Sequence, residues 1–199
     1  MNVKEFPPLP TSSRERAFAL FDALKKKDLI PDGFIEEMTD LVANQYDPSN
    51  GARIVARAWT DPAFYERLMS DSIAAVVEMG YIGAQGEYPV PVVDTPTVKN
   101  VIVCSLCSCT NWPVLGLAPE WYKSFEFRAR LVREGREVLQ ELGTELPPDM
   151  NVQVWDTTAE SRYFVLPMRP AGSEGMTEEE LRKLVTKDVL IGVALPNVA

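Results

Sequence analysis

The chain has 199 residues, among them three cysteines and no histidine. Without an imidazole it cannot contain a Ser-His-Asp triad, a Cys-His nucleophile pair or a histidine-based zinc site. Lys and Arg number 20 against 29 Asp and Glu, a formal net charge of -9. That charge argues against nucleic acid or an anionic membrane as a partner. No segment approaches the roughly 20 apolar residues that cross a bilayer, and the proline-dotted N-terminus does not resemble a secretory signal, so we expect a cytoplasmic protein.

The first 80 residues have the pattern of short helices separated by clear breaks. Ser12 and Glu15 have the spacing of a capping box, and Asp61 followed by Pro62 places a capping residue before a helix-starting proline. Short helices with little core of their own need a surface to lie against. We therefore predict a helical arm over residues 1–80 that either folds back on its own chain or wraps a partner.

From residue 81 onward the pattern changes to mixed helices and strands. An extended region at Val90–Thr97 leads into a β-branched strand at Val98–Val103, and a long helix is predicted at Glu120–Leu142 with a break allowed near Ser124. Further strands are predicted at Met150–Trp155, Tyr163–Leu166 and Val189–Leu195, and a capping box at Thr177 and Glu180. The expected fold is α+β: the helical arm followed by a layered α/β domain over residues 81–199.

All three cysteines lie in the segment Cys104-Ser105-Leu106-Cys107-Ser108-Cys109, directly after the strand at Val98–Val103. A zinc ribbon would need a second, distant cysteine pair, and a C-x-x-C redox motif lacks the third thiol. Buried structural cysteines at a strand end are the plainer alternative. Because every cysteine of the chain falls within this one segment, a metal or redox role is favoured.

Three thiolates so close together can converge only if the loop curls into a claw with Ser108 at its crown. The backbone nitrogens of Ser108 and Cys109 would then lie beside the metal and, once deprotonated, form five-membered chelate rings with the sulfurs. Three sulfurs and two amide nitrogens leave one open coordination position. This strongly donating, anionic set suits trivalent iron or cobalt better than zinc.

The cysteine segment, with Trp112-Pro113 just after it, closely resembles the α subunit of nitrile hydratase. The resemblance extends over nearly the whole chain after about Arg14. In that family Ser at position 105 goes with the iron form and Thr with the cobalt form. Thr110 also matches the iron form, because cobalt members tend to have tyrosine there. Further matching segments are Trp59-Thr60-Asp61-Pro62, Gly83-Ala84-Gln85-Gly86-Glu87-Tyr88, Asp94-Thr95-Pro96-Thr97, Trp121-Tyr122-Lys123-Ser124, Arg128-Ala129-Arg130, Tyr163-Phe164-Val165-Leu166-Pro167 and Arg169-Pro170-Ala171-Gly172.

The resemblance assigns a role to each member of the claw. It implies Fe(III), with cobalt as the alternative, bound by Cys104 as axial thiolate, by Cys107 and Cys109 in the basal plane, and by the backbone amides of Ser108 and Cys109. It also implies that Cys107 is oxidised to sulfinic acid and Cys109 to sulfenic acid, which lowers the electron donation of both sulfurs.

The implied reaction is hydration of a small nitrile to an amide. Cys109, as the sulfenate, is the candidate nucleophile or base, with the order of attack by sulfenate or water left open, and Ser108 tunes the claw. Gln85 matches a family glutamine that orients water, or is simply part of a turn. Trp112 is a wall of the substrate pocket, or part of the core.

The resemblance also implies partners. Two arginines of a separate β subunit would bind the cysteine oxygens, giving an αβ heterodimer or (αβ)2 that the arm wraps, and an activator protein would deliver the metal. Two other functions are considered: a thiocyanate-hydrolase-like subunit and a non-catalytic thiol-metal redox sensor. The acidic run Glu178-Glu179-Glu180 is interpreted as a solvated capping face. Four arginines are interpreted as a surface helix or as partners for carboxylates of another subunit: Arg128, Arg130, Arg133 and Arg136.

Overall fold

The computed structural model describes residues 12–81, 88–105 and 109–198, and the chain divides into two units, Met1–Leu41 and Val42–Ala199. The first contains α1 (Ser13–Lys25) and most of α2 (Phe34–Asn44). The predicted capping box is confirmed: the Glu15 N–H donates to Ser12 Oγ at 3.1 Å, and the Ser12 N–H donates to the Glu15 carboxylate at 3.1 Å. Among the residues of these two helices, all of which the structure describes, none is buried.

Three helices between residues 48 and 78 belong to the second unit rather than to the arm. They are α3 (Pro48–Thr60), α4 (Pro62–Ser70) and α5 (Ser72–Glu78), and an aspartate caps each of them. Several of their apolar side chains, Ile54 and Phe64 among them, are fully buried in the core. The boundary between the two units therefore falls after Leu41, whereas the sequence pattern placed it at residue 80. The pattern could not show this, because the burial of these helices depends on tertiary packing.

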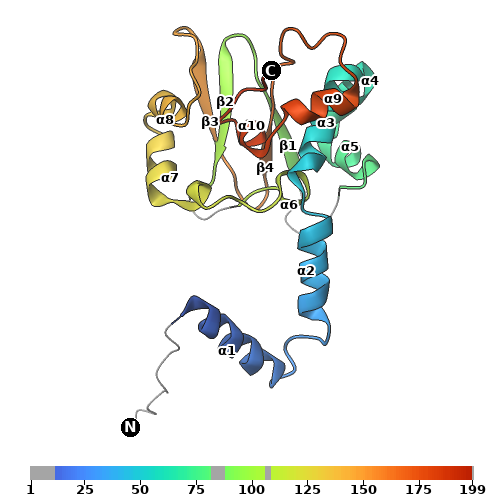
Figure 1. The fold of residues 1–199 in the computed structure, drawn as a ribbon, viewed down its shortest axis with the longest axis vertical. Helices are drawn as coiled ribbons and strands as arrows, with labels where there is room; N and C mark the ends of the chain where they lie inside the picture. The colour runs from blue at the N-terminus through green and yellow to red at the C-terminus, as the bar shows by residue number, and fades with distance from the viewer. Residues whose placement is uncertain (1–11, 82–87, 106–108, 199) are drawn as a thin grey trace. The chain divides into compact units, whose positions relative to one another are not determined.

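Four strands form two parallel pairs in the centre of the second unit (Figure 1). Strand β1 (Pro89–Val93) pairs with β4 (Arg162–Leu166), and β2 (Val98–Val103) pairs with β3 (Asn151–Asp156). The register of the second pair runs from Val98 opposite Asn151 to Val103 opposite Asp156. The predicted strands at these positions are confirmed, and the mixed helix-and-strand architecture is the expected α+β class.

The remaining helices cover the strand pairs on both sides (Figure 1). Helices α7 and α8 lie beside β3, whereas α10 contacts β2 and β4. The elements and their bounds are α6 (Trp112–Leu115), the 3-10 turn η1 (Trp121–Lys123), α7 (Phe125–Leu131), α8 (Gly135–Glu141), α9 (Glu178–Leu181), the 3-10 turn η2 (Arg182–Leu184) and α10 (Lys187–Ile191).

Two sequence predictions differ from this structure. In the long helix predicted at Glu120–Leu142, the break allowed near Ser124 is confirmed, since Ser124 is extended and its side chain caps α7 by accepting from the Phe127 N–H at 3.1 Å. The difference is a second break between α7 and α8, where Glu134 leaves the helical conformation with φ -138° and ψ 47°. The strand predicted at Val189–Leu195 is wrong: the apolar run begins in α10, where Thr186 caps the helix and Gly192 ends it with φ 95°. A short apolar run does not distinguish a buried strand from a buried helical segment.

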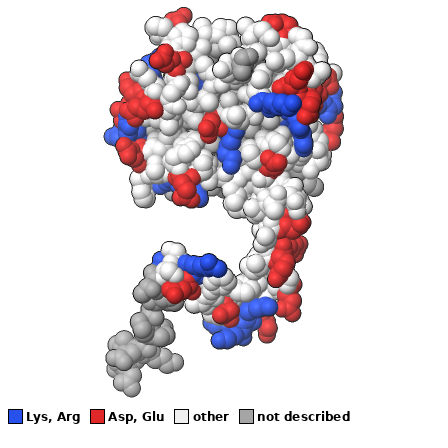
Figure 2. All heavy atoms as spheres, in the orientation of Figure 1, with Lys and Arg blue, Asp and Glu red and all other residues white. Residues whose placement is uncertain are grey.

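The surface carries side chains of both charges, as the composition of the sequence predicts. On the face shown in Figure 2, acidic and basic side chains are interspersed over the second unit, and acidic side chains lie along α2, where Glu36 and Glu37 occupy the first turn. None of the helices in the described ranges has the length and apolar character needed to cross a membrane.

Candidate metal centre

The claw begins at the end of the most buried strand of the structure. Val101, Ile102 and Val103 of β2 are completely buried, and Cys104 after them is 1% exposed. The Thr157 N–H donates to the Val103 carbonyl at 2.7 Å, which carries the β2–β3 pairing up to the cysteine. Cys104 therefore has a fixed position that the packing of both strands determines.

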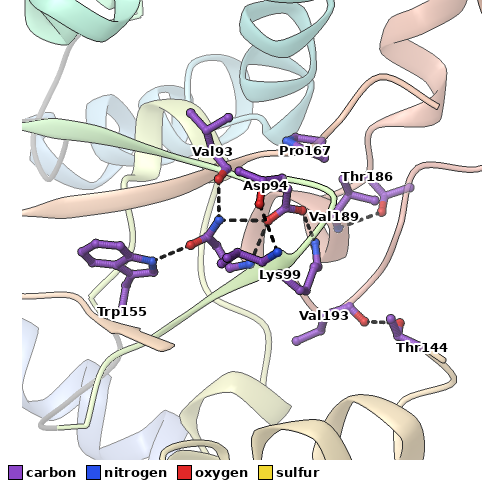
Figure 3. A network of polar contacts seen from close by, with 12 residues as sticks. Val93, Asp94, Lys99, Thr144, Trp155, Pro167, Thr186, Val189 and Val193 are labelled. Carbon is purple, nitrogen blue, oxygen red and sulfur yellow. Dashed lines mark hydrogen bonds and ion pairs between the residues drawn. The ribbon is translucent and has the colours of Figure 1, made fainter. Parts of the chain in front are cut away.

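The other end of β2 is fixed by a buried polar network (Figure 3). Lys99 Nζ lies 2.7 Å from Asp94 Oδ2, and both side chains are almost fully buried. Asp94 Oδ1 also accepts from the Asn100 backbone N–H at 2.7 Å. The Asn100 side chain accepts from Trp155 Nε1 at 2.8 Å, which joins β2 to β3. Burial lowers the pKa of Lys99, and the carboxylate of Asp94 partly offsets this effect.

Ser105, the first loop residue, is bound from two sides. Its backbone N–H donates to Asp156 Oδ1 at 2.9 Å, and its hydroxyl donates to Asp156 Oδ2. On the other side, Arg128 Nη1 donates to the Ser105 carbonyl at 3.4 Å. The end of β3 and the helix α7 thus fix the backbone immediately after Cys104.

Cys109, the last residue of the cysteine segment, is bound through its backbone by the hydroxyl of Tyr122. Tyr122 is fully buried, and its hydroxyl donates to the Cys109 carbonyl at 3.4 Å. Burial raises the pKa of Tyr122 well above its usual range, and the neighbouring Cys104, Cys109 and Asp156 act in the same direction. The phenol therefore stays protonated, and its proton is donated to the backbone of one of the predicted metal ligands, Cys109.

Three further predicted site residues, Cys107, Ser108 and Gln85, lie outside the described residues. Among the residues that are described, no group of three Cys, Asp or Glu side chains is placed to hold a metal ion. The geometry of the complete claw thus stays a prediction. What the structure describes is its two ends, Cys104 and Cys109, and the groups that fix them.

The segment after Cys109 contains a buried amide that needs a partner. Asn111 is completely buried at the start of α6, and within the described part of the chain neither its Nδ2 nor its Oδ1 has a hydrogen-bond partner. An unpaired buried polar group costs about 1–3 kcal/mol, so it normally marks a water or another polar group that completes the site. Asn111 lies two residues after Cys109, where a polar group of an occupied claw would satisfy its amide. The residues present therefore fit a metal bound by sulfur.

Trp112, the predicted pocket wall, is half-buried and contacts Tyr46 with ring centroids 5.5 Å apart. This contact fixes the ring, while its role towards a substrate stays a prediction.

The four arginines interpreted as one helical stripe are divided between α7, α8 and the turn that joins them, where Arg133 lies, and they have partners within the chain. Arg130 forms ion pairs with Glu134 at 2.9 Å and Glu141 at 2.7 Å, and Arg136 donates to backbone carbonyls. Arg128 is buried and reaches the metal loop.

The sequence reasoning missed three residues that contact the claw: Asp156, Tyr122 and Arg128. Asp156 follows a predicted strand, and Tyr122 and Arg128 stand in segments that carry the family resemblance. Only the pairing of β2 with β3 and the position of α7 bring them to the loop, and neither can be read from local spacing.

Comparison with known proteins agrees with this site. The family model described as "Nitrile hydratase, alpha chain" matches residues 11–194. The chain is 50% identical over 192 residues, 95% of this chain and 93% of the relative, to the low-molecular weight cobalt-containing nitrile hydratase subunit alpha of Rhodococcus rhodochrous. It is 42% identical over 161 residues, 75% of this chain and 66% of the relative, to the thiocyanate hydrolase subunit gamma of Thiobacillus thioparus.

Among solved structures, a double mutant of the Fe-type nitrile hydratase from Comamonas testosteroni Ni1 superposes with a TM-score of 0.88. The identity is 44%, covering 92% of this chain and 89% of that one. The cysteine segment, the fold around it and these matches agree, and the chain belongs to the nitrile hydratase alpha-chain family, whose members are subunits of hydro-lyases.

Proposed function

We propose that this chain hydrates nitriles to amides at a metal ion bound by the thiolates of Cys104, Cys107 and Cys109 and by the backbone amides of Ser108 and Cys109. The observation that carries the proposal is the burial of Cys104 at the end of β2, with the Cys109 carbonyl bound by the buried hydroxyl of Tyr122, in a chain of this family. Sulfur donors held in a buried, fixed frame favour a tightly bound metal ion.

We propose Fe(III) as the metal, with cobalt as the alternative that the names of several relatives raise. Two residues support iron. Ser105 is the residue of the iron form, and its hydroxyl is bound to Asp156. Thr110 is 1% exposed and its hydroxyl donates to the Gly116 carbonyl at 3.3 Å, so the larger tyrosine typical of cobalt forms would require repacking here.

The bound trivalent ion would act as a Lewis acid that polarises the nitrile carbon. The chain's own residues do the remaining work. The sulfenate oxygen of Cys109 serves as nucleophile or as the base that takes a proton from water, and Gln85 orients that water. Ser108 tunes the claw by hydrogen bonding, and Trp112 forms a wall of the substrate pocket. The sulfinate of Cys107 adds polar oxygens to the rim.

The active protein would contain a β subunit, as an αβ heterodimer or (αβ)2, whose two arginines bind the cysteine oxygens. The arm that wraps it is supported by α1, in which Phe18 and Leu20 are 57% and 60% exposed. Exposed apolar side chains on a helix with no buried residue indicate a surface that a partner covers. A metal-delivery activator and a cytoplasmic location complete the proposal.

Purified complex from iron-fed and cobalt-fed cells tests it. We expect nitrile turnover that follows the iron content; turnover by iron-free complex would refute the iron assignment. Thiocyanate hydrolysis without nitrile turnover would favour the function of the thiocyanate hydrolase relative. A metal-loaded complex that converts neither substrate would favour a redox sensor.

The oxidation states are tested separately by the mass of the peptide that contains Cys107 and Cys109. A sulfinic acid adds two oxygens and a sulfenic acid one, so the active enzyme should carry three in total. An unmodified peptide from fully active enzyme would contradict the proposed claw chemistry.

A further inference from the structure

Arg128 is a buried cation beside the metal loop that the reaction as proposed does not use. It lies on α7 and is only 8% exposed. Its Nη1 donates to the Ser105 carbonyl and its Nε to the Ser124 carbonyl, each at 3.4 Å. Its Cζ lies 4.6 Å from the ring centroid of Phe125, which covers one face of the guanidinium. The two hydrogen bonds and the ring contact together fix the orientation of the guanidinium group.

The neighbouring arginines are used differently. Arg130 is bound to Glu134 and Glu141. Arg133, in the turn after α7, is exposed and donates to the Ala129 carbonyl of that helix. Arg128 instead crosses from α7 to a carbonyl that lies between two of the proposed metal ligands. Arg128 thus joins the N-cap of its own helix, through the Ser124 carbonyl, to the proposed metal loop, through the Ser105 carbonyl.

The negative charge of the proposed metal loop requires a nearby positive charge. Three thiolates and two deprotonated amides carry five negative charges, whereas a trivalent metal ion carries three positive ones, so the bound centre is anionic. Asp156, on the other side of Ser105, adds a further carboxylate. Cys104 is buried, and a buried anionic group is strongly destabilising unless a cation or hydrogen-bond donors compensate it. Arginine suits this position because it stays protonated and is more weakly hydrated than lysine.

We propose that Arg128 is a positioning residue of the metal loop: its guanidinium holds the Ser105 carbonyl and supplies this chain's own positive charge to the anionic centre. This inference rests on the function proposed above. It differs from the role of the β-subunit arginines, which would bind the cysteine oxygens, because Arg128 acts on the backbone from within the α chain.

The test compares Arg128→Lys and Arg128→Met with Arg133→Met, each in the complex coexpressed with the β subunit. Arg133→Met removes an exposed positive charge from the turn directly after α7 and is the control. The readouts are metal content per complex, the sulfur-to-metal charge-transfer absorption band, and kcat and KM separately. Loss of an outer-shell partner of a metal ligand typically costs about 10- to 100-fold in metal affinity or activity.

We expect Arg128→Met to lose metal, and Arg128→Lys to retain it with a shifted absorption band and a kcat about 10-fold lower at unchanged KM. Arg133→Met should match the wild type. The proposal is overturned if both Arg128 variants keep the wild-type band and metal content, or if they only melt earlier while the band per bound metal is unchanged. If Arg128→Met fails to fold, Arg128→Lys decides. A wild-type complex without nitrile turnover would refute the proposed function, while the band comparison would still test Arg128.

Discussion

Replacing Asp94 with Asn would leave the ammonium group of Lys99 buried without its counter-ion. The Lys99 side chain is 1% exposed and that of Asp94 5%, with 2.7 Å between Nζ and Oδ2 (Figure 3). The asparagine oxygen can still accept from the Asn100 N–H that Asp94 binds, so the substitution mainly removes the charge. The perturbation thus acts on one ion pair at the start of β2, the strand that ends at Cys104.

The magnitude follows from the distance and the burial. At an effective dielectric constant of about 20, two unit charges 2.7 Å apart attract each other by about 6 kcal/mol before desolvation is counted. Breaking a buried pair by removing one partner typically costs about 3–5 kcal/mol. For a chain of this size, each kcal/mol lowers the melting temperature by about 2–4 °C. We therefore expect Asp94→Asn to lower it by about 6–20 °C.

Thermal melting of the complex carrying Asp94→Asn, Lys99→Met or both substitutions measures this effect. The double variant should recover much of the loss, since an uncharged replacement of a buried pair is often close to neutral. Glu120→Gln, which removes an exposed ion pair with Lys123, is the control and should change the melting temperature very little. An Asp94→Asn melt within about 2 °C of the wild type, or a double variant no better than the single one, would refute the reasoning.

The same site gives stability a pH dependence with a defined sign. Burial lowers the pKa of Lys99 in the folded protein below the ordinary value of 10.5. Between these two values the unfolded chain binds more protons than the folded one, so the contribution of Lys99 to stability rises with pH and is lost as the pH falls through the folded pKa. Lys99→Met should remove this contribution. A melting-temperature difference between wild type and Lys99→Met that does not change over the alkaline range would contradict it.

Four further substitutions test the fold and the claw. Gly192→Ala places a Cβ 2.1 Å from the Asn100 carbonyl oxygen at a φ of 95°, and the melt should show a loss well above the typical ~1 kcal/mol of a point mutation; a wild-type melt would disprove the close approach. Cys109→Ala should remove metal and activity together, whereas Gln85→Ala should lower turnover with metal bound, as metal analysis and assay will show; equal metal loss in both would contradict a water-orienting role for Gln85. Tyr122→Phe should keep the fold and lower activity about 10-fold, through loss of the donor to the Cys109 carbonyl; unchanged kinetics would exclude that donor from the site.

Local chemistry was readable from the sequence wherever a few neighbouring residues decide the outcome. The capping boxes at Ser12 and Thr177 exist because Ser or Thr and a Glu three residues later satisfy each other's backbone donors without help from the rest of the chain. The cysteine segment is equally local, since its three sulfurs are close in sequence whatever surrounds them. The strand at Val98–Val103 was readable because a β-branched run of that length favours a strand.

What the sequence did not show depends on contacts between distant segments. The parallel pairing of β2 with β3 brings Asp156 to Ser105 across 51 residues of chain, and no periodicity specifies it. The helical state of Lys187–Ile191 depends on the Thr186 cap and on the close approach of Gly192 to the Asn100 carbonyl. The position of α3, α4 and α5 in the core depends on partners in other parts of the chain, since α3 packs against α6, α9 and α10 and α5 packs against β1.

The two described ends of the claw differ in how firmly the fold holds them, and this difference bears on how a metal would be bound. Cys104 is fixed by a fully buried strand and by the contacts of Ser105 with Asp156 and Arg128. Cys109 is half-buried and is held by the Tyr122 hydroxyl at its carbonyl. One rigid end and one more accessible end suit the proposed centre, in which the axial thiolate of Cys104 is not oxidised. The sulfur of Cys109, at the accessible end, is the one that is oxidised. Oxidation of a thiolate requires access to the oxidant, and burial of Cys104 denies that access while Cys109 retains it.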